Sequence, residues 1–147
     1  MTAIVADDVA ITWTIPHDGS SEVTGYTVLI RTSDLVSFSE EPINCDGLDL
    51  VVHSTTSCSV PIAKLIVDPF NLPWGSSIVV KVRAINVVGA SPYSAEGSGA
   101  IILTNPDAPY NLVNVPEITA KHQIGLDWES LTFSGGEDVL DFTISYA

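Results

Sequence analysis

The stretch Ser77–Ser91, SIVVKVRAINVVGAS, has the clearest strand pattern in the chain. With a period of two, four aliphatic residues fall on one face: Ile78, Val80, Val82 and Ala84. The opposite face carries Val79, Lys81, Arg83 and Ile85. Asn86–Gly89 has the residue types of a turn, and Gly89 can adopt the positive φ that β-branched residues resist. The stretch therefore predicts a strand that buries one face and ends in a turn.

Two earlier strands are predicted by the same alternation. The stretch Val9–Pro16 places its large apolar residues on one face: Val9, Ile11, Trp13 and Ile15. A turn over residues 17–21 leads to the strand Gly25–Arg31, whose inward side chains are Tyr26, Val28 and Ile30. Alternation of this kind is typical of antiparallel sheets with one buried face.

The sequence in the middle of the chain indicates an irregular edge of the predicted sheet. Pro42 and the Asp46-Gly47 pair favour a short edge strand and a loop over residues 32–49. Short strands are predicted at Leu50–His53 and Cys58–Ile62, and Ala63–Val67 fits one helical turn. A last strand is predicted at Ala100–Thr104.

Cys45 and Cys58 are the two cysteines of the chain. The segment around them lacks the additional His or Cys that a zinc site needs, so a disulfide is the better interpretation. Closing a loop of this size contributes about 3 kcal/mol by the chain-entropy estimate. A persistent disulfide indicates an oxidising compartment, and we expect an extracellular or cell-surface location.

The composition narrows the classes of partner. The 147 residues include 18 acidic and 5 basic side chains, which gives a net charge of −13. Without a basic stripe, nucleic acid and anionic membrane surfaces are unfavourable partners. No apolar run is long enough to span a membrane, and no EF-hand spacing is present, so we expect no cofactor and no dedicated metal site. Weak calcium binding and O-linked glycosylation stay open.

The pattern of the first strands returns after a proline-rich stretch. This stretch predicts a stiff inter-domain linker formed by Pro106, Asp107, Ala108 and Pro109. Beyond it, Ile124, Leu126 and Trp128 alternate with polar residues as Ile11 and Trp13 do, and Leu140–Tyr146 reads as a third strand. Trp128 is thus the counterpart of Trp13, and Phe142 that of Tyr26.

The chain resembles the fibronectin type III family of tandem β-sandwich domains. The residues that carry the resemblance are Trp13, the pair Gly25-Tyr26, the corner Leu72–Gly75, the strand and turn Val80–Ser91 and the linker Pro106–Pro109. The resemblance implies an all-β, immunoglobulin-like antiparallel sandwich followed by an incomplete second copy. One departure is Ile78, which stands where the family usually has the tyrosine of the tyrosine corner, so that hydrogen bond must be absent or replaced.

Compared with each other, the two copies suggest how the chain is divided. Residues 1–105 form a first domain that lacks most of its first strand, and residues 106–147 form the first three strands of a second domain. A piece of about 40 residues buries too little apolar surface to be stable by itself. We therefore expect another chain to complete it, or neighbouring strands of a longer array in the same polypeptide.

The sequence favours a module over an enzyme. His17, His53 and His122 lie in turns or beside strands, without a nucleophile motif or paired metal spacing. The first hypothesis is a non-enzymatic extracellular structural repeat, held in a tandem array or head-to-tail filament by contacts with neighbouring repeats or copies of itself. The alternative is a cell-surface adhesion or receptor-type module that binds a protein or glycan through residues 17–23 or 86–94.

A candidate interface follows from the outward positions of the strand at 77–91. Val79, Ile85, Val87 and Val88 are apolar where a solvent-facing strand would be polar. Apolar residues that gather on a surface usually mark a contact with a neighbour. We therefore predict that these four residues are covered by another repeat.

Overall fold

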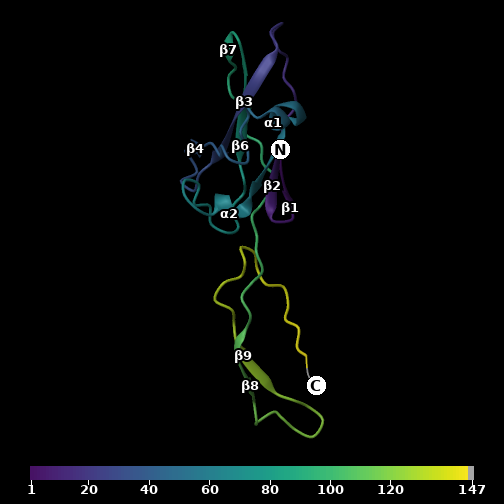
Figure 1. The fold of residues 1–147 in the computed structure, drawn as a ribbon. Helices are drawn as coiled ribbons and strands as arrows, with labels where there is room; N and C mark the ends of the chain where they lie inside the picture. The colour runs from purple at the N-terminus through teal and green to yellow at the C-terminus, as the bar shows by residue number, and fades with distance from the viewer. Residues whose placement is uncertain (146–147) are drawn as a thin grey trace. The chain divides into compact units, whose positions relative to one another are not determined.

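The chain divides into two compact units, the first formed by Met1–Ile102 and the second beginning at Leu103. In the first unit, the alternating strands build two antiparallel sheets (Figure 1). The structure is a computed structural model and describes residues 1–145. The division lies before the predicted boundary at 105/106, and each unit is described by itself.

One sheet of the first unit has the order β1-β2-β5. Its strands are β1 (Thr2–Val5), β2 (Asp8–Thr12) and β5 (Ser57–Pro61). Val9 pairs with Val60 and Ile11 with Cys58, so the apolar residues of both strands point to the same side. Strand β1 pairs with β2 at the edge where we expected a truncated first strand.

The second sheet has the order β4-β3-β6-β7. Its strands are β4 (Phe38–Ser39), β3 (Val23–Arg31), β6 (Val80–Asn86) and β7 (Gly89–Ala90). The predicted last strand, Ala100–Thr104, forms backbone hydrogen bonds and an isolated bridge with residues 75–78 but no continuous ladder. One of these bonds runs from Ile78 N–H to the Ala100 carbonyl at 2.9 Å. Irregular pairing leaves this stretch without the ladder of a full strand.

The inward residues of the two sheets make one core. Tyr26, Val28 and Ile30 are buried as predicted, and Val82 and Ala84 pack against the same cluster. The largest fully buried side chains come from both sheets and from the loops between them: Phe70, Ile11, Ile30, Leu65, Ile78, Ile102, Val9 and Val60. The all-β, immunoglobulin-like sandwich expected from the sequence is therefore confirmed.

Two residues point the opposite way from the prediction. Ile15 is 70% exposed, because β2 ends at Thr12, where its partner β5 begins. Val79 is only 7% exposed, although the alternation placed it on the outer face. Regular pleating starts at Val80, and the residues before it need not alternate.

The predicted strand at Leu50–His53 is a helix. Helix α1 (Leu50–Thr55) begins at Asp49, whose carboxylate accepts hydrogen bonds from Val51 N–H at 2.8 Å and Val52 N–H at 3.2 Å. An N-cap aspartate satisfies the free amides of the first turn and so favours a helix over a strand. The predicted helical turn that follows is the short helix α2 (Ile62–Leu65).

A hydrogen-bonded turn between β3 and β4 is built on Asp34. Its carboxylate accepts from Ser37 N–H at 2.7 Å, Val36 N–H at 2.9 Å and the Thr32 hydroxyl at 2.8 Å. Hydrogen bonding from the Ser37 side chain, then from these backbone amides and Thr32, holds the pKa of Asp34 well below its usual range. Because the folded-state pKa is depressed, the charge stabilises the turn above about pH 4, and that contribution is lost as the pH falls further.

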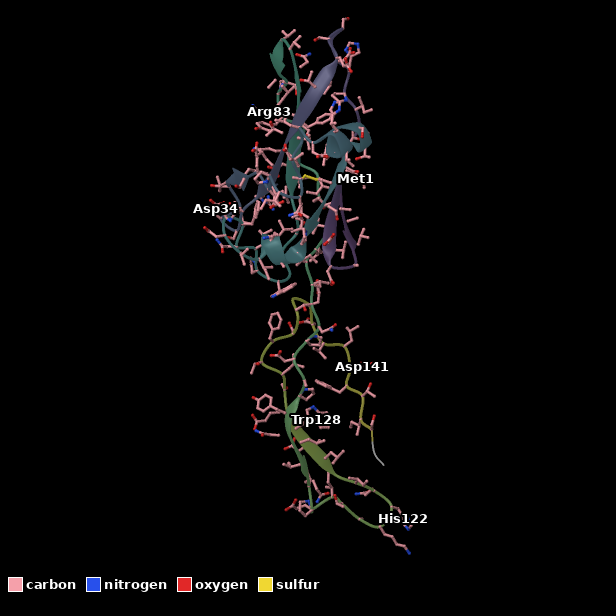
Figure 2. The ribbon with its side chains drawn as sticks, in the orientation of Figure 1. Met1, Asp34, Arg83, His122, Trp128 and Asp141 are labelled. Carbon is pink, nitrogen blue, oxygen red and sulfur yellow. A yellow bond between two sulfur atoms is a disulfide. The ribbon has the colours of Figure 1, made fainter. Side chains whose placement is uncertain are left out.

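Cys45 and Cys58 form the predicted disulfide (Figure 2). Both cysteines are buried, and their Cα atoms are 5.1 Å apart. The bridge joins the connection between β4 and α1 to β5, which belongs to the other sheet. It thus fixes the irregular edge of the sandwich in place.

The second unit has one two-stranded sheet, made of β8 (Tyr110–Asn114) and β9 (Leu126–Glu129). The predicted third strand is wrong over residues 140–145, which have no regular structure, and Tyr146 lies outside the described residues. The predicted linker, Pro106–Pro109, makes contacts inside this unit: Asp107 N–H donates to the Phe133 carbonyl and the Thr132 hydroxyl to the Asp107 carboxylate, each at 3.0 Å.

Removing the disulfide should lower the stability of the first unit. We expect the double change Cys45→Ala and Cys58→Ala to reduce the free energy of unfolding by about 3 kcal/mol, because the unfolded chain gains loop entropy. Urea unfolding followed by tryptophan fluorescence measures the difference. Val36→Ala, at a residue that is 80% exposed, is the control. Equal stability of the double variant and the control would contradict a stabilising role for the bridge.

Candidate functional site

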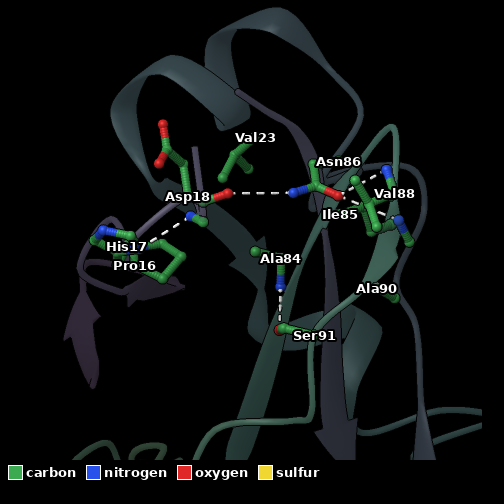
Figure 3. A pocket seen from close by; sticks show the side chains of 12 residues that line it. Pro16, His17, Asp18, Val23, Ala84, Ile85, Asn86, Val88, Ala90 and Ser91 are labelled. Carbon is green, nitrogen blue, oxygen red and sulfur yellow. Dashed lines mark hydrogen bonds between the residues drawn. The ribbon is translucent and has the colours of Figure 1, made fainter. Parts of the chain in front are cut away.

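Two loops meet at one end of the first unit and line an open pocket of about 370 Å³ (Figure 3). The connection from β2 to β3 contributes Pro16–Gly19 and the start of β3 contributes Val23. The end of β6 and the turn into β7 contribute Ala84–Asn86 and Val88–Ser91. The pocket therefore unites the two segments, 17–23 and 86–94, that the sequence offered as separate ligand-binding loops.

The side chain of Asn86 holds the two loops together. Its Oδ1 accepts hydrogen bonds from Val88 N–H at 2.9 Å and Gly89 N–H at 3.1 Å, which closes the β6–β7 turn. Its Nδ2 donates to the Asp18 carbonyl at 3.3 Å (Figure 3). The same nitrogen donates to the Ser21 carbonyl, also at 3.3 Å. The sequence identified Asn86 only as a turn residue, because nothing local to it shows that a distant loop supplies acceptors.

The opposite loop is ordered by its own side chains. His17 Nδ1 accepts from Gly19 N–H at 3.0 Å, and Asp18 Oδ1 accepts from Ser20 N–H at 2.8 Å. A nitrogen that accepts a hydrogen bond carries no proton, so the proton of the neutral His17 ring lies on Nε2. The loop thus holds one imidazole and one carboxylate in defined positions beside the pocket.

The four residues of the predicted interface do not form one surface. Val87 and Val88 are 87% and 84% exposed on the turn between β6 and β7. Ile85 is half-buried and lines the pocket, whereas Val79 is buried. Val79 is therefore corrected to a buried position, and of the four residues only Val87 and Val88, at the tip of the turn, are exposed.

The outer face of the second sheet gathers three of the five basic residues of the chain: Arg31, Lys81 and Arg83. Lys81 Nζ lies 3.7 Å from the centroid of the Phe38 ring, and the Arg83 guanidinium lies 4.9 Å from that of Tyr93. Arg31 is paired with Glu96 at 3.7 Å. Each cation is thus engaged within the face by an aromatic ring or a carboxylate.

The three histidines do not combine into a reactive cluster. His53 Nε2 lies 2.9 Å from the Val23 carbonyl and its ring lies 5.7 Å from that of Tyr26, which is a packing role. His17 is in the pocket loop, and His122 is exposed in the connection between β8 and β9 (Figure 2). Over residues 1–145, no three His, Cys, Asp or Glu side chains are grouped so that they could hold a metal ion.

The first unit is thus an antiparallel immunoglobulin-like sandwich, with a pocket between two loops at one end. A family model described as the fibronectin type III domain matches residues 1–99, and the chain belongs to that family. Domains of this family are generally non-catalytic binding or structural modules and are often extracellular. Among the described residues, no helix is long and apolar enough to cross a membrane.

Asn86→Ala should loosen the pocket. The change removes the acceptor of the Val88 and Gly89 amides and the two donors to the other loop, so we expect these amides to exchange faster with solvent. The expected loss in free energy of unfolding is about 1–2 kcal/mol. Hydrogen exchange followed by NMR measures the first effect and urea unfolding the second.

Val87→Ala is the matched control, because Val87 lies in the same turn and is 87% exposed. It should change the free energy of unfolding by less than about 0.5 kcal/mol. Unchanged exchange at Val88 and Gly89 in Asn86→Ala would contradict the bridging role of the side chain.

Proposed function

We propose that the chain is a non-enzymatic extracellular structural repeat, part of a tandem array or head-to-tail filament in which repeats contact their neighbours. The observation that carries the proposal is that the second unit repeats an aromatic pair of the first unit but leaves its apolar side chains exposed. The repeat indicates a common design, and the exposed side chains indicate a surface that a neighbour covers.

The aromatic pairs have the same geometry in both units. Trp13 and Tyr26 meet edge to face with ring centroids 5.2 Å apart, and Trp128 and Phe142 do so at 5.7 Å. In the first unit, Tyr26 is 4% exposed because β3 and β6 complete the core around it. Phe142 is 44% exposed, since no regular strand of the second unit's described residues packs over it.

The exposed apolar residues of the second unit lie in β8, just before β9 and in the segment that follows β9. Leu112 is 62% exposed, Ile124 66% and Leu140 96%. Full burial of a leucine or isoleucine is worth about 1.5–3 kcal/mol, so covering these side chains supplies a driving force for contact. A two-stranded sheet also offers unpaired edges, to which the strand of a neighbour can add.

The chemistry of the chain supports an extracellular setting. The buried disulfide persists under oxidising conditions, and the net charge of −13 keeps the repeats apart except where apolar surface drives contact. Both properties suit a long surface protein or filament.

The pocket between the two loops favours a second candidate function, a cell-surface adhesion or receptor-type module. A volume of about 370 Å³ suits a side chain of a protein ligand or one sugar unit of a glycan. Val87 and Val88 add an exposed apolar tip beside it. Val88→Ser should then weaken ligand capture and leave contacts between repeats unchanged.

Replacing exposed apolar residues of the second unit should abolish contacts between copies. We expect the whole chain to associate as its concentration rises, and the double variant Leu112→Ser and Ile124→Ser to stay at 15.6 kDa, because the surface that drives contact is gone. Sedimentation velocity over a concentration series measures the difference.

The matched control is Leu35→Ser with Val36→Ser, two residues of the first unit that are 68% and 80% exposed. This control should associate as the unchanged chain does. A 15.6 kDa species at every concentration of the unchanged chain would contradict assembly between copies.

A further inference from the structure

The pocket loop carries an aspartate-glycine pair next to an imidazole. We propose that Asp18 is a site of spontaneous isomerisation to isoaspartate, in which His17 acts as the base. This modification goes beyond the proposed function and depends on neither candidate. It rests on three neighbouring residues and the hydrogen bonds between them.

The hydrogen bonds place the reacting groups together. Asp18 Oδ1 accepts from Ser20 N–H at 2.8 Å, which holds the carboxyl group over the peptide that follows it. The nitrogen of that peptide, Gly19 N, is the atom that must attack Cγ of Asp18. The Gly19 N–H already donates to His17 Nδ1 at 3.0 Å, so an acceptor for its proton is in contact before the reaction begins.

Isomerisation through a succinimide needs no reagent other than water, which is lost in the first step and added in the second. Gly19 N forms a bond to Cγ of the protonated Asp18 carboxyl group, while His17 Nδ1 takes the N–H proton. The Cγ–OH bond breaks, and the oxygen leaves as water with its own proton and the one that His17 carried. Water then opens the five-membered succinimide ring, and attack at the former backbone carbonyl yields isoaspartate with the same mass and charge.

No neighbouring group crowds the position where the ring would close. Asp18 and Gly19 are exposed, and a Cβ built on Gly19 would meet no atom within 4 Å. Glycine also presents no side chain against the approaching carboxyl group. Neither steric crowding nor packing therefore opposes the attack.

The other aspartate-glycine pair of the chain is an internal comparison. Asp46 makes the same local bond, because its Oδ1 accepts from Leu48 N–H at 2.9 Å. Gly47, however, is buried against the Tyr26 backbone, and its carbonyl accepts from Tyr26 N–H at 3.0 Å. The preceding residue is the disulfide-bonded Cys45, which offers no base. Asp46 should therefore isomerise much more slowly than Asp18.

Isomerisation would change the pocket itself. Isoaspartate routes the backbone through the side chain and adds one atom to it at position 18. The Asp18 carbonyl accepts a hydrogen bond from Asn86 Nδ2, the group that joins the two loops. The longer backbone displaces that carbonyl, so the modified chain has a loosened pocket.

The test incubates the whole chain at neutral pH and body temperature and follows isoaspartate at each position by peptide mapping with electron-transfer fragmentation. We expect isoaspartate at Asp18 to accumulate several-fold faster than at Asp46. Equal rates at the two positions would overturn the proposal.

Three variants separate a base from a structural role. His17→Ala removes both the base and the hydrogen-bond acceptor, whereas His17→Asn keeps an acceptor for the amide two residues on but is not a base. Both should slow isomerisation at Asp18 roughly threefold or more. His122→Ala, in the second unit, should leave the rate unchanged. A full rate in His17→Asn, or in His17→Ala, would overturn the role of His17 as the base.

Discussion

The register between β3 and β6 is the constraint on which the first unit depends. Tyr26 pairs with Ala84, Val28 with Val82 and Ile30 with Val80, and a shift of one residue would turn every side chain to the wrong face. The register buries the aliphatic residues of both strands and turns the cations outward over aromatic rings. It also places the end of β6 beside the β2–β3 loop, where Asn86 can bridge the two loops of the pocket.

The second unit shows what happens to the same pattern when no such pair of strands is formed. Trp128 and Phe142 still meet edge to face, because two neighbouring aromatic rings need only each other. The residues around them stay exposed, since β8 and β9 alone cannot enclose a core. Local aromatic contact is thus repeated between the units, while burial depends on strands that are distant in the sequence.

The sequence predicts what depends on alternation and composition: the family, the sandwich, the inward faces of β3 and β6, and the Cys45–Cys58 disulfide. It misses features decided by distant partners or single hydrogen bonds. Asp49 caps a helix where an aliphatic run suggested a strand, and residues 140–145 form no strand because none pairs with them. At Ile78, where the family's tyrosine is absent, the buried Thr2 hydroxyl donates to the backbone carbonyl at 3.1 Å, a contact that no local pattern reveals.

Amide hydrogen exchange of the whole chain, at a concentration where it is monomeric, tests the central claim that the first unit has its own core and the second needs a neighbour. The account predicts that amides of β3 and β6 exchange only through global unfolding, whereas those of β8 and β9 exchange at rates close to an unfolded chain. Equal protection of β8–β9 and β3–β6 in the monomer would contradict it, because the second unit would then be stable without a neighbour.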